Sequence, residues 1–145
     1  MKDGTATPHI DALIVFRKNN KVAFLLRHNT RWMDGFYGLP GGKVEHGEAY
    51  SAAAVREAKE ETGITMTPEN LKHVLTMHRH SDDGDWVDVI FEAHDWVGEP
   101  INNEPNKHAE LKWFLLTNLP QNIIPVTRYY LELVSQGKSY GEYGW

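Results

Sequence analysis

The stretch Gly42-Lys-Val-Glu-His-Gly-Glu-Ala-Tyr-Ser-Ala-Ala-Ala-Val-Arg-Glu-Ala-Lys-Glu-Glu-Thr-Gly-Ile64 is the most informative part of this chain. Three of its carboxylates, Glu57, Glu60 and Glu61, are spaced i, i+3 and i+4. On a helix these positions share one face, where like charges repel and weaken the helix. A bound cation would remove this cost, and Mg²⁺ prefers carboxylate oxygens together with water and substrate phosphate. The stretch therefore predicts a metal site that handles phosphates.

The spacing of these residues resembles the Nudix box, Gly-x5-Glu-x7-Arg-Glu-U-x-Glu-Glu-x-Gly-U, in which U is a bulky apolar residue. Ile64 fills the last apolar position, whereas Ala58 at the first one is smaller than the usual Leu or Ile. The fixed positions of the pattern are occupied by Gly42, Glu48, Arg56, Glu57, Glu60, Glu61 and Gly63. The resemblance implies an α/β fold class: the Nudix α/β/α sandwich, a mixed β-sheet flanked by helices.

The length and composition limit what the chain can be. Its 145 residues are 41% hydrophobic and 24% charged, so we expect one Nudix hydrolase domain over residues 1–145. A net charge of −5 argues against a nucleic-acid polymer as partner, because binding one needs a basic surface. The absence of cysteine excludes disulfides and thiolate chemistry. No apolar run has the length of a membrane helix or a signal-peptide core, so we expect a cytoplasmic protein without membrane contact.

Apolar periodicity and turn residues predict a sheet with two helices. Residues 48–62 form the expected box helix, which is rich in alanine and followed by Gly63 as a left-handed cap. The expected strands are 9–17, 22–28, 71–80, 86–96 and 111–116, and the second expected helix is 125–136. Residues 39–42 and 81–85 are expected as turns, 101–108 as a loop, and 139–145 as a tail that is loosely ordered or docks on a neighbour.

The resemblance implies a role for each acid of the box. In characterised Nudix enzymes the matching glutamates bind divalent metal, so Glu57, Glu60 and Glu61 are the expected ligands of Mg²⁺, which Mn²⁺ can replace. One box glutamate takes a proton from the attacking water, and this general base is either Glu57 or Glu60. The carbonyl group of Gly41 is a further metal ligand implied by the resemblance.

Three other residues of the box are expected to support these ligands. Gly42 allows the backbone to approach an ion or a phosphate closely. Arg56 is expected to pair with a box carboxylate and to fix its orientation, although it could also contact phosphate. Glu48 lies at the start of the expected helix, where a negative charge is favourable.

A distal carboxylate and three flanking residues are further candidates. In the antimutator-type branch of nucleoside triphosphate pyrophosphohydrolases, Trp-x-Gly-Glu-Pro is followed four residues later by a metal-binding Glu. Residues 96–100 followed by Glu104 resemble that arrangement, with an ordinary loop glutamate as the alternative. Arg27 and His28 end the second expected strand and are candidates for phosphate contact, unless they are plain surface residues. Phe36 is a candidate for stacking on a base, and sealing the core is the alternative.

These residues together predict a Mg²⁺-dependent hydrolase that cleaves a diphosphate linkage through metal-activated water. The expected substrates are nucleoside triphosphates or other small molecules linked to a nucleoside diphosphate. One alternative is an ADP-ribose or nucleotide-sugar pyrophosphatase, and another is a non-catalytic nucleotide-sensing module. The aromatic tail and the edges of the expected sheet would allow a homodimer.

Overall fold

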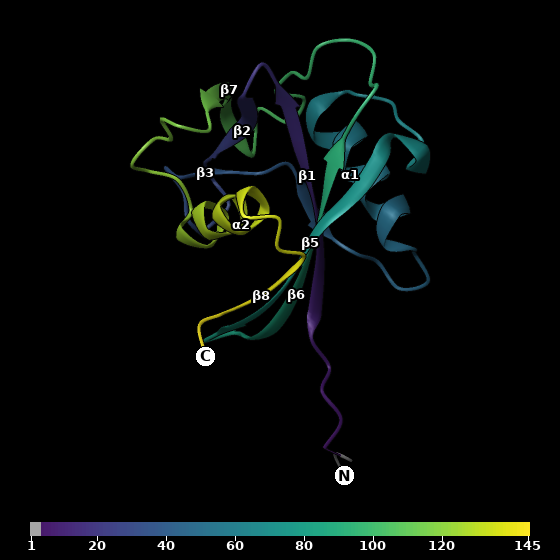
Figure 1. Ribbon diagram of the computed structural model, residues 1–145, viewed down its shortest axis with the longest axis vertical. Coiled ribbons are helices and arrows are strands. Elements are labelled where there is room, and N and C mark those ends of the chain that lie inside the picture. The colour runs from purple at the N-terminus through teal and green to yellow at the C-terminus, as the bar shows by residue number, and fades with distance from the viewer. Residues whose placement is uncertain (1–3) are drawn as a thin grey trace.

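The computed structural model describes residues 4–145, so the first three residues of the predicted 1–145 domain lie outside the described chain (Figure 1). The elements in chain order are β1 (His9–Lys18), β2 (Lys21–Arg27), β3 (Tyr37–Gly38), β4 (Gly41–Lys43), α1 (Tyr50–Thr62), the 3-10 helix η1 (Pro68–Asn70), β5 (Leu71–Ser81), β6 (Gly84–Ala93), β7 (His108–Leu115), α2 (Pro125–Ser135) and β8 (Tyr140–Tyr143). That residues 1–145 form a single domain stays a prediction. Within residues 4–145, no helix is long and apolar enough to cross a membrane.

The sheet is mixed, and β1 lies at its centre. β1 pairs in parallel with β6 and antiparallel with both β2 and β4. The strand order is β3-β2-β1-β6-β5-β8, and β7 pairs with β2. Because successive side chains of a strand point to opposite faces, β1 directs its even-numbered residues to one face and its odd-numbered residues to the other.

The helices α1 and α2 lie on opposite faces of this sheet, so the predicted α/β sandwich with a mixed sheet is confirmed (Figure 1). On the α1 face, Ile14 and Phe16 of β1 pack with Ala53, Ala54 and Ala58 of the helix, and all five are fully buried. Alanine has no side chain beyond Cβ, so the helix backbone comes close to the sheet. The carboxylates of α1 are thereby held near β4, the strand that follows the turn at Pro40.

The other face is covered by α2 and is lined by larger apolar side chains. Val15, Leu75 and Ile90 of the sheet share one buried cluster with Tyr130 and Leu133 of the helix. Burying such side chains contributes about 1.5–3 kcal/mol each relative to exposure. This second core anchors the sheet, so that β1 and β4 present a fixed surface to the box helix.

The box helix α1 starts two residues later than predicted. Ala49 has extended backbone angles (φ −67°, ψ 149°), and the Glu48 side chain accepts a hydrogen bond from the Glu45 N–H at 3.0 Å instead of joining the helix. The C-terminus agrees with the prediction, because Gly63 adopts φ 77° and its N–H bonds the Lys59 carbonyl at 3.1 Å.

Two strand boundaries differ from the prediction. β6 ends at Ala93 rather than residue 96, because the His94 N–H bonds the Asn70 carbonyl at 2.8 Å and Asp95 takes φ 56°. β7 begins at His108 rather than residue 111, because His108 pairs with Arg27 of β2 across a bulge at Ala109 of β7.

Three segments that were predicted without strands carry them. Gly41 and Gly42 were predicted as part of a turn, but they form β4 opposite Leu13 and Ala12. The turn predicted at 81–85 shrinks to residues 82–83, and the expected tail includes β8, which pairs in parallel with β5. Trp145 follows β8 and donates its indole N–H to the His78 carbonyl at 3.0 Å. The tail therefore docks on its own sheet.

Candidate active site

The most deeply buried acid of the box is Glu61, in the last turn of α1. Its side chain accepts a hydrogen bond from the Gly41 N–H at 2.8 Å, and the residue is only 8% exposed. Burial raises the pKa of Glu61 to about 8, while the Gly41 hydrogen bond opposes this shift and the charges of Glu57 and Glu104 add to it. A buried acid surrounded by acids is the environment that a cation would stabilise.

Arg56 donates hydrogen bonds to two other acids of the box, Glu48 and Glu57. Its Nε and Nη2 atoms donate to the two oxygens of Glu48 at 2.7 and 3.0 Å, and Nη1 donates to Glu57 at 2.9 Å. Nη2 also reaches the Lys43 carbonyl at 3.1 Å. The hydrogen bonds from Arg56 lower the pKa of Glu48 to about 2. The planar guanidinium of Arg56 thus bonds Glu48 through two nitrogens and Glu57 through the third, which supports the predicted orienting role of Arg56.

The remaining acids differ in how freely they can move. The Glu57 side chain is 12% exposed, whereas that of Glu60 is 49% exposed and lies 3.4 Å from Arg56. Burial raises the pKa of Glu57, and Arg56 opposes that shift. Glu57 is therefore a held carboxylate, and Glu60 is one that can reach out to solvent or to a ligand.

The two glycines of β4 lie where a side chain would collide with the site. A Cβ on Gly42 would fall 2.6 Å from a carboxylate oxygen of Glu57. Gly41 adopts φ 142°, and a Cβ there would meet the Ala12 carbonyl oxygen at 2.2 Å. Both positions require glycine, and the backbone of β4 consequently lies directly against the box carboxylates.

The loop before β7 brings Glu104 to the same end of α1. The Asn103 side chain donates to the carbonyls of Lys59 and Glu60 at 3.4 and 3.1 Å, and the Asn103 N–H bonds the Glu61 carbonyl at 2.9 Å. These bonds satisfy carbonyls that a helix end leaves free. The charge of Glu104 acts on both Glu57 and Glu61, so the distal acid predicted from sequence does lie near the box acids.

Arg27, at the end of β2, lies near the acids of the box. Burial lowers the pKa of Arg27, and the charges of Glu61, Asp34 and Asp11 oppose this. The Arg27 guanidinium lies 5.0 Å from the ring centre of Trp32 and donates to the Trp32 carbonyl at 2.8 Å. This places a cation close to the buried box acid, at the end of β2.

The other two flanking candidates have structural contacts. A ring nitrogen of His28 lies 2.8 Å from the Pro105 carbonyl, in the loop that carries Glu104. Phe36 is partly buried and packs against the core on the α2 face, which supports its alternative role in sealing that core.

One residue near the site, Asp11, was missed in the sequence. Asp11 of β1 pairs in register with Lys43 of β4, and the charge of Glu57 acts on Asp11. Burial raises the pKa of Asp11 to about 6, the charge of Asp88 adds to this, and Arg79 and Lys43 oppose it. A lone acid in the apolar run of residues 9–16 was the available signal.

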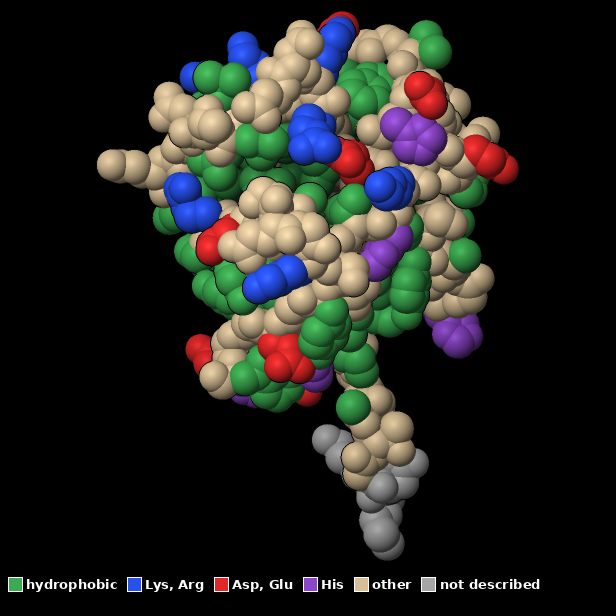
Figure 2. All heavy atoms as spheres, viewed as in Figure 1, with side chains coloured by type: hydrophobic (Ala, Val, Ile, Leu, Met, Phe, Trp, Pro, Cys, Tyr) green, Lys and Arg blue, Asp and Glu red, His purple; other side chains and the backbone are tan. Residues whose placement is uncertain are grey.

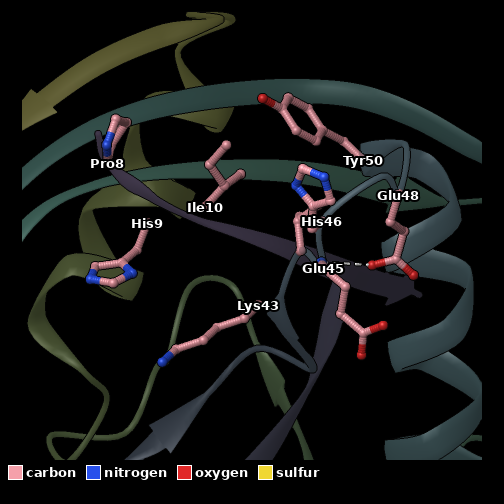
Figure 3. Close-up of a pocket in the computed structure, with 9 residues that line it drawn as sticks. Pro8, His9, Ile10, Lys43, Glu45, His46, Glu48 and Tyr50 are labelled. Carbon is pink, nitrogen blue, oxygen red and sulfur yellow. Dashed lines mark hydrogen bonds between the residues drawn. The ribbon is translucent and has the colours of Figure 1, made fainter. Parts of the chain in front are cut away.

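An open cavity of about 350 Å³ lies beside the loop that leads into α1 (Figure 3). Its walls include His9, Lys43, Glu45, His46, Glu48 and Tyr50. His9 and Lys43 lie on one side of it, and the residues of the loop and the helix start lie on the other. The cavity therefore adjoins both the box and the strand that carries Asp11.

The donor set fits a hard divalent cation, although the ligands are not preassembled. In the part of the chain that the structure describes, no three His, Asp or Glu side chains already form a group able to hold a metal ion. The fit comes from the chemistry of the donors: Glu61 is buried without a cation, Glu57 is held beneath Gly42, and only carboxylate and carbonyl oxygens are offered. Oxygen donors of this kind suit Mg²⁺ or Mn²⁺.

Comparisons with known proteins agree with this geometry. Residues 7–134 match the NUDIX domain family. The chain is 35% identical over 107 residues to the ADP-ribose pyrophosphatase of Methanocaldococcus jannaschii; the match covers 74% of this chain but only 62% of that protein. It is 32% identical over 109 residues to the 8-oxo-dGTP diphosphatase of Proteus vulgaris, with 75% of each covered. A MutT NUDIX hydrolase structure from Burkholderia pseudomallei aligns with TM-score 0.78 and 32% identity, over 87% of this chain and 97% of that one.

Proposed function

This chain belongs to the Nudix domain family, and we propose that it is a pyrophosphohydrolase. It cleaves a diphosphate linkage in nucleoside triphosphates or in other compounds linked to a nucleoside diphosphate, by attack of water on phosphorus. The observation that carries the proposal is the excess of carboxylates around the C-terminal half of α1. Glu57, Glu60 and Glu61 share that half with Arg56 as their one neighbouring guanidinium within the helix, and Glu61 makes no ion pair within residues 4–145.

The proposed ligands of the metal are the carboxylates Glu57, Glu60, Glu61 and Glu104 and the carbonyl of Gly41. Mg²⁺ is the proposed ion and Mn²⁺ its substitute; when bound, such an ion neutralises phosphate charge and lowers the pKa of a water ligand. The chain itself supplies orientation. Arg56 holds Glu57, the Gly41 N–H holds Glu61, and Asn103 holds the loop that carries Glu104.

The general base is proposed to be Glu57 or Glu60. Burial raises the pKa of Glu57, which makes it a stronger base than an exposed glutamate and favours it as the proton acceptor. The greater exposure of Glu60 favours Glu60 instead, because its carboxylate is free to move toward a water molecule while Arg56 stays bonded to Glu48. Arg27, with its guanidinium near Glu61, is the proposed contact for a substrate phosphate.

A small nucleotide is the proposed partner. On the face that Figure 2 shows, Lys and Arg side chains are scattered among acidic and apolar ones instead of forming a stripe. That distribution supports a small substrate over a nucleic-acid polymer. Cytoplasmic location and a homodimer stay predictions, and sedimentation would settle the second.

The substrate class has one specific competitor. The M. jannaschii relative is named an ADP-ribose pyrophosphatase, and the P. vulgaris relative is named an 8-oxo-dGTP diphosphatase. An ADP-ribose or nucleotide-sugar pyrophosphatase therefore remains the second candidate, and the full set of acids in the box weighs against a non-catalytic nucleotide sensor.

The test is a product-resolved hydrolysis panel with saturating Mg²⁺. It compares common and oxidised nucleoside triphosphates, ADP-ribose and nucleotide sugars for the wild type, Glu57→Gln, Glu60→Gln and the exposed control Glu132→Gln on α2. We expect the base variant to lose at least about 100-fold in kcat, which is the usual contribution of general-base catalysis, with Glu132→Gln unchanged. Monophosphate and pyrophosphate from a triphosphate support the first candidate. If Glu57→Gln and Glu60→Gln both hydrolyse every compound as fast as the wild type, the assignment of the general base is refuted.

A further inference from the structure

Two aspartates occupy neighbouring positions on the α2 face of the sheet. Asp11 of β1 and Asp88 of β6 are partners in the parallel register, and Lys43 of β4 is the partner of Asp11 on its other side. Arg79 of β5 lies on the same face and interacts with both acids. Two acids and two cations therefore form a patch at one end of the apolar core.

Asp88 has its hydrogen-bonding capacity taken up within the protein. Arg79 donates Nε to one oxygen of Asp88 at 2.8 Å and Nη2 to the other at 3.0 Å, and the Tyr130 hydroxyl donates to the first oxygen. Asp88 is fully buried, so this bidentate pair is structural.

Asp11 is different, because its carboxylate is left without a hydrogen bond. The nearest cation atom is Arg79 Nη2 at 3.9 Å, which is beyond hydrogen-bond distance. Within residues 4–145 no donor is bonded to the Asp11 carboxylate, yet the side chain is only 20% exposed. This carboxylate still reaches solvent and has no donor bonded to it within the described residues, so both of its oxygens are available to accept hydrogen bonds from a ligand.

The position of Asp11 connects this spare acceptor with the active site. The charges of Asp11 and Glu57 act on each other, and the charge of Asp11 also acts on Arg27. Two neighbours of Asp11, His9 two residues before it on β1 and its partner Lys43 on β4, line the cavity of about 350 Å³ (Figure 3). Asp11 does not itself line this cavity, but it lies beside two of its wall residues, so a molecule that extends from the box past Lys43 comes close to Asp11.

We propose that Asp11 is a specificity-determining residue that accepts two parallel N–H bonds from a guanine-type base of the substrate. The ring N–H and the exocyclic amino group of such a base present the same two-donor edge with which Arg79 binds Asp88. The inference rests on the proposed function in taking the substrate to be a nucleotide. Adenine offers an acceptor where guanine offers its ring N–H, so it cannot satisfy both oxygens.

Binding of nucleoside monophosphates tests the proposal without any turnover. Calorimetric titrations with GMP, IMP and AMP in the presence of Mg²⁺ compare the wild type with Asp11→Asn. IMP keeps the ring N–H and lacks the amino group. We expect the wild type to bind GMP at least about tenfold more tightly than AMP, with IMP between them, because hydrogen bonds to a charged group are strong. Asp11→Asn should lose about tenfold or more for GMP and less than about twofold for AMP.

The control is Asp95→Asn, the same chemical change at an aspartate whose side chain is 87% exposed. It should bind all three nucleotides as the wild type does. Equal binding of GMP and AMP by the wild type would overturn the proposal even if Asp11→Asn failed to fold. An equal loss for all three nucleotides in Asp11→Asn would do the same, because it would indicate a general change of the site. If the protein prefers GMP but hydrolyses none of the compounds, the proposed function is refuted and the role of Asp11 in base recognition is still supported.

Discussion

The chain contains two groups of acids that differ in how their charge is balanced. The box cluster, Glu48, Glu57, Glu60 and Glu61 around Arg56, has four carboxylates for one guanidinium. Its most buried member, Glu61, accepts a hydrogen bond from a backbone N–H and makes no ion pair within residues 4–145. Such an imbalance weakens the metal-free protein and is the condition in which a cation binds favourably.

The sheet cluster, Asp11 and Asp88 with Arg79 and Lys43, has equal numbers of acids and cations. Its central pair is bidentate and buried beneath Tyr130. The number of acids therefore does not identify a metal site by itself. What separates the two clusters is whether the protein supplies the opposite charge, so removing the charge of a buried acid should have opposite effects on stability in the two clusters.

The largest expected effect is loss of stability when the balanced pair is broken. Asp88→Asn leaves the Arg79 guanidinium buried, with Asp11 at 3.9 Å as its remaining acid. Removing one partner of a buried pair costs about 3–5 kcal/mol. Urea unfolding should show the midpoint moving down with an unchanged m-value. The exposed Asp82→Asn should stay within about 0.5 kcal/mol of the wild type, and a similarly small change for Asp88→Asn would contradict the structural role of this pair.

The box cluster should respond to pH in the opposite sense from a stabilising ion pair. The pKa of Glu61 rises from 4.5 to about 8 on folding because the side chain is buried. Between these values the folded metal-free protein holds a proton that the unfolded chain has released. Its stability should therefore fall as pH rises through this window, by at most about 1.4 kcal/mol per pH unit.

Denaturant unfolding in EDTA at pH 5, 6, 7 and 8 measures this slope. Glu61→Gln keeps an oxygen for the Gly41 N–H but removes the charge, so the variant should show a flatter dependence and be more stable than the wild type at pH 8. Saturating Mg²⁺ should stabilise the wild type most at pH 8, where the ligand is deprotonated. Identical slopes for the two proteins would show that Glu61 does not titrate in this range.

Metal binding should also depend on the absence of a side chain at Gly42. In Gly42→Ala the new Cβ would lie 2.6 Å from a Glu57 oxygen, so the carboxylate must move away from β4. Disturbing the support of a ligand typically costs about 10–100-fold in metal affinity. Calorimetry with Mn²⁺ measures it directly. Lys72→Ala, at an exposed position of β5, is the control; matching affinities of the two variants would place Glu57 outside the metal site.

The box helix and its acids could be predicted because their pattern is local. The spacing of Glu57, Glu60 and Glu61 fixes a shared face once the segment is helical, and Gly63 marks the end. The approach of Glu104 was predictable only through resemblance, because Asn103 joins its loop to the helix end through bonds between distant residues.

The features that escaped prediction depend on the pairing of strands. Asp11 and Asp88 are single acids in apolar runs, and only the parallel register of β1 and β6 brings them together. The order of strands in a mixed sheet cannot be read from periodicity, since each strand alternates in the same way. The tail was also missed, because Tyr140 to Tyr143 form a strand only against the edge of β5.

The smallest expected effect on stability comes from Arg56→Lys, which keeps the positive charge in the box cluster but removes the planar guanidinium. Arg56 holds Glu48 with two nitrogens and Glu57 with the third, whereas a lysine ammonium is a point charge that cannot span both carboxylates. Because the Arg56 side chain is 26% exposed, unfolding should become easier by no more than about 1 kcal/mol. Activity should fall by about tenfold or more, since Glu57 loses the contact that orients it toward the metal. Arg17→Lys, at a surface pair with Glu92, should alter neither quantity. Full activity in Arg56→Lys would mean that the charge of this residue suffices and that its planar fork does not orient the box carboxylates.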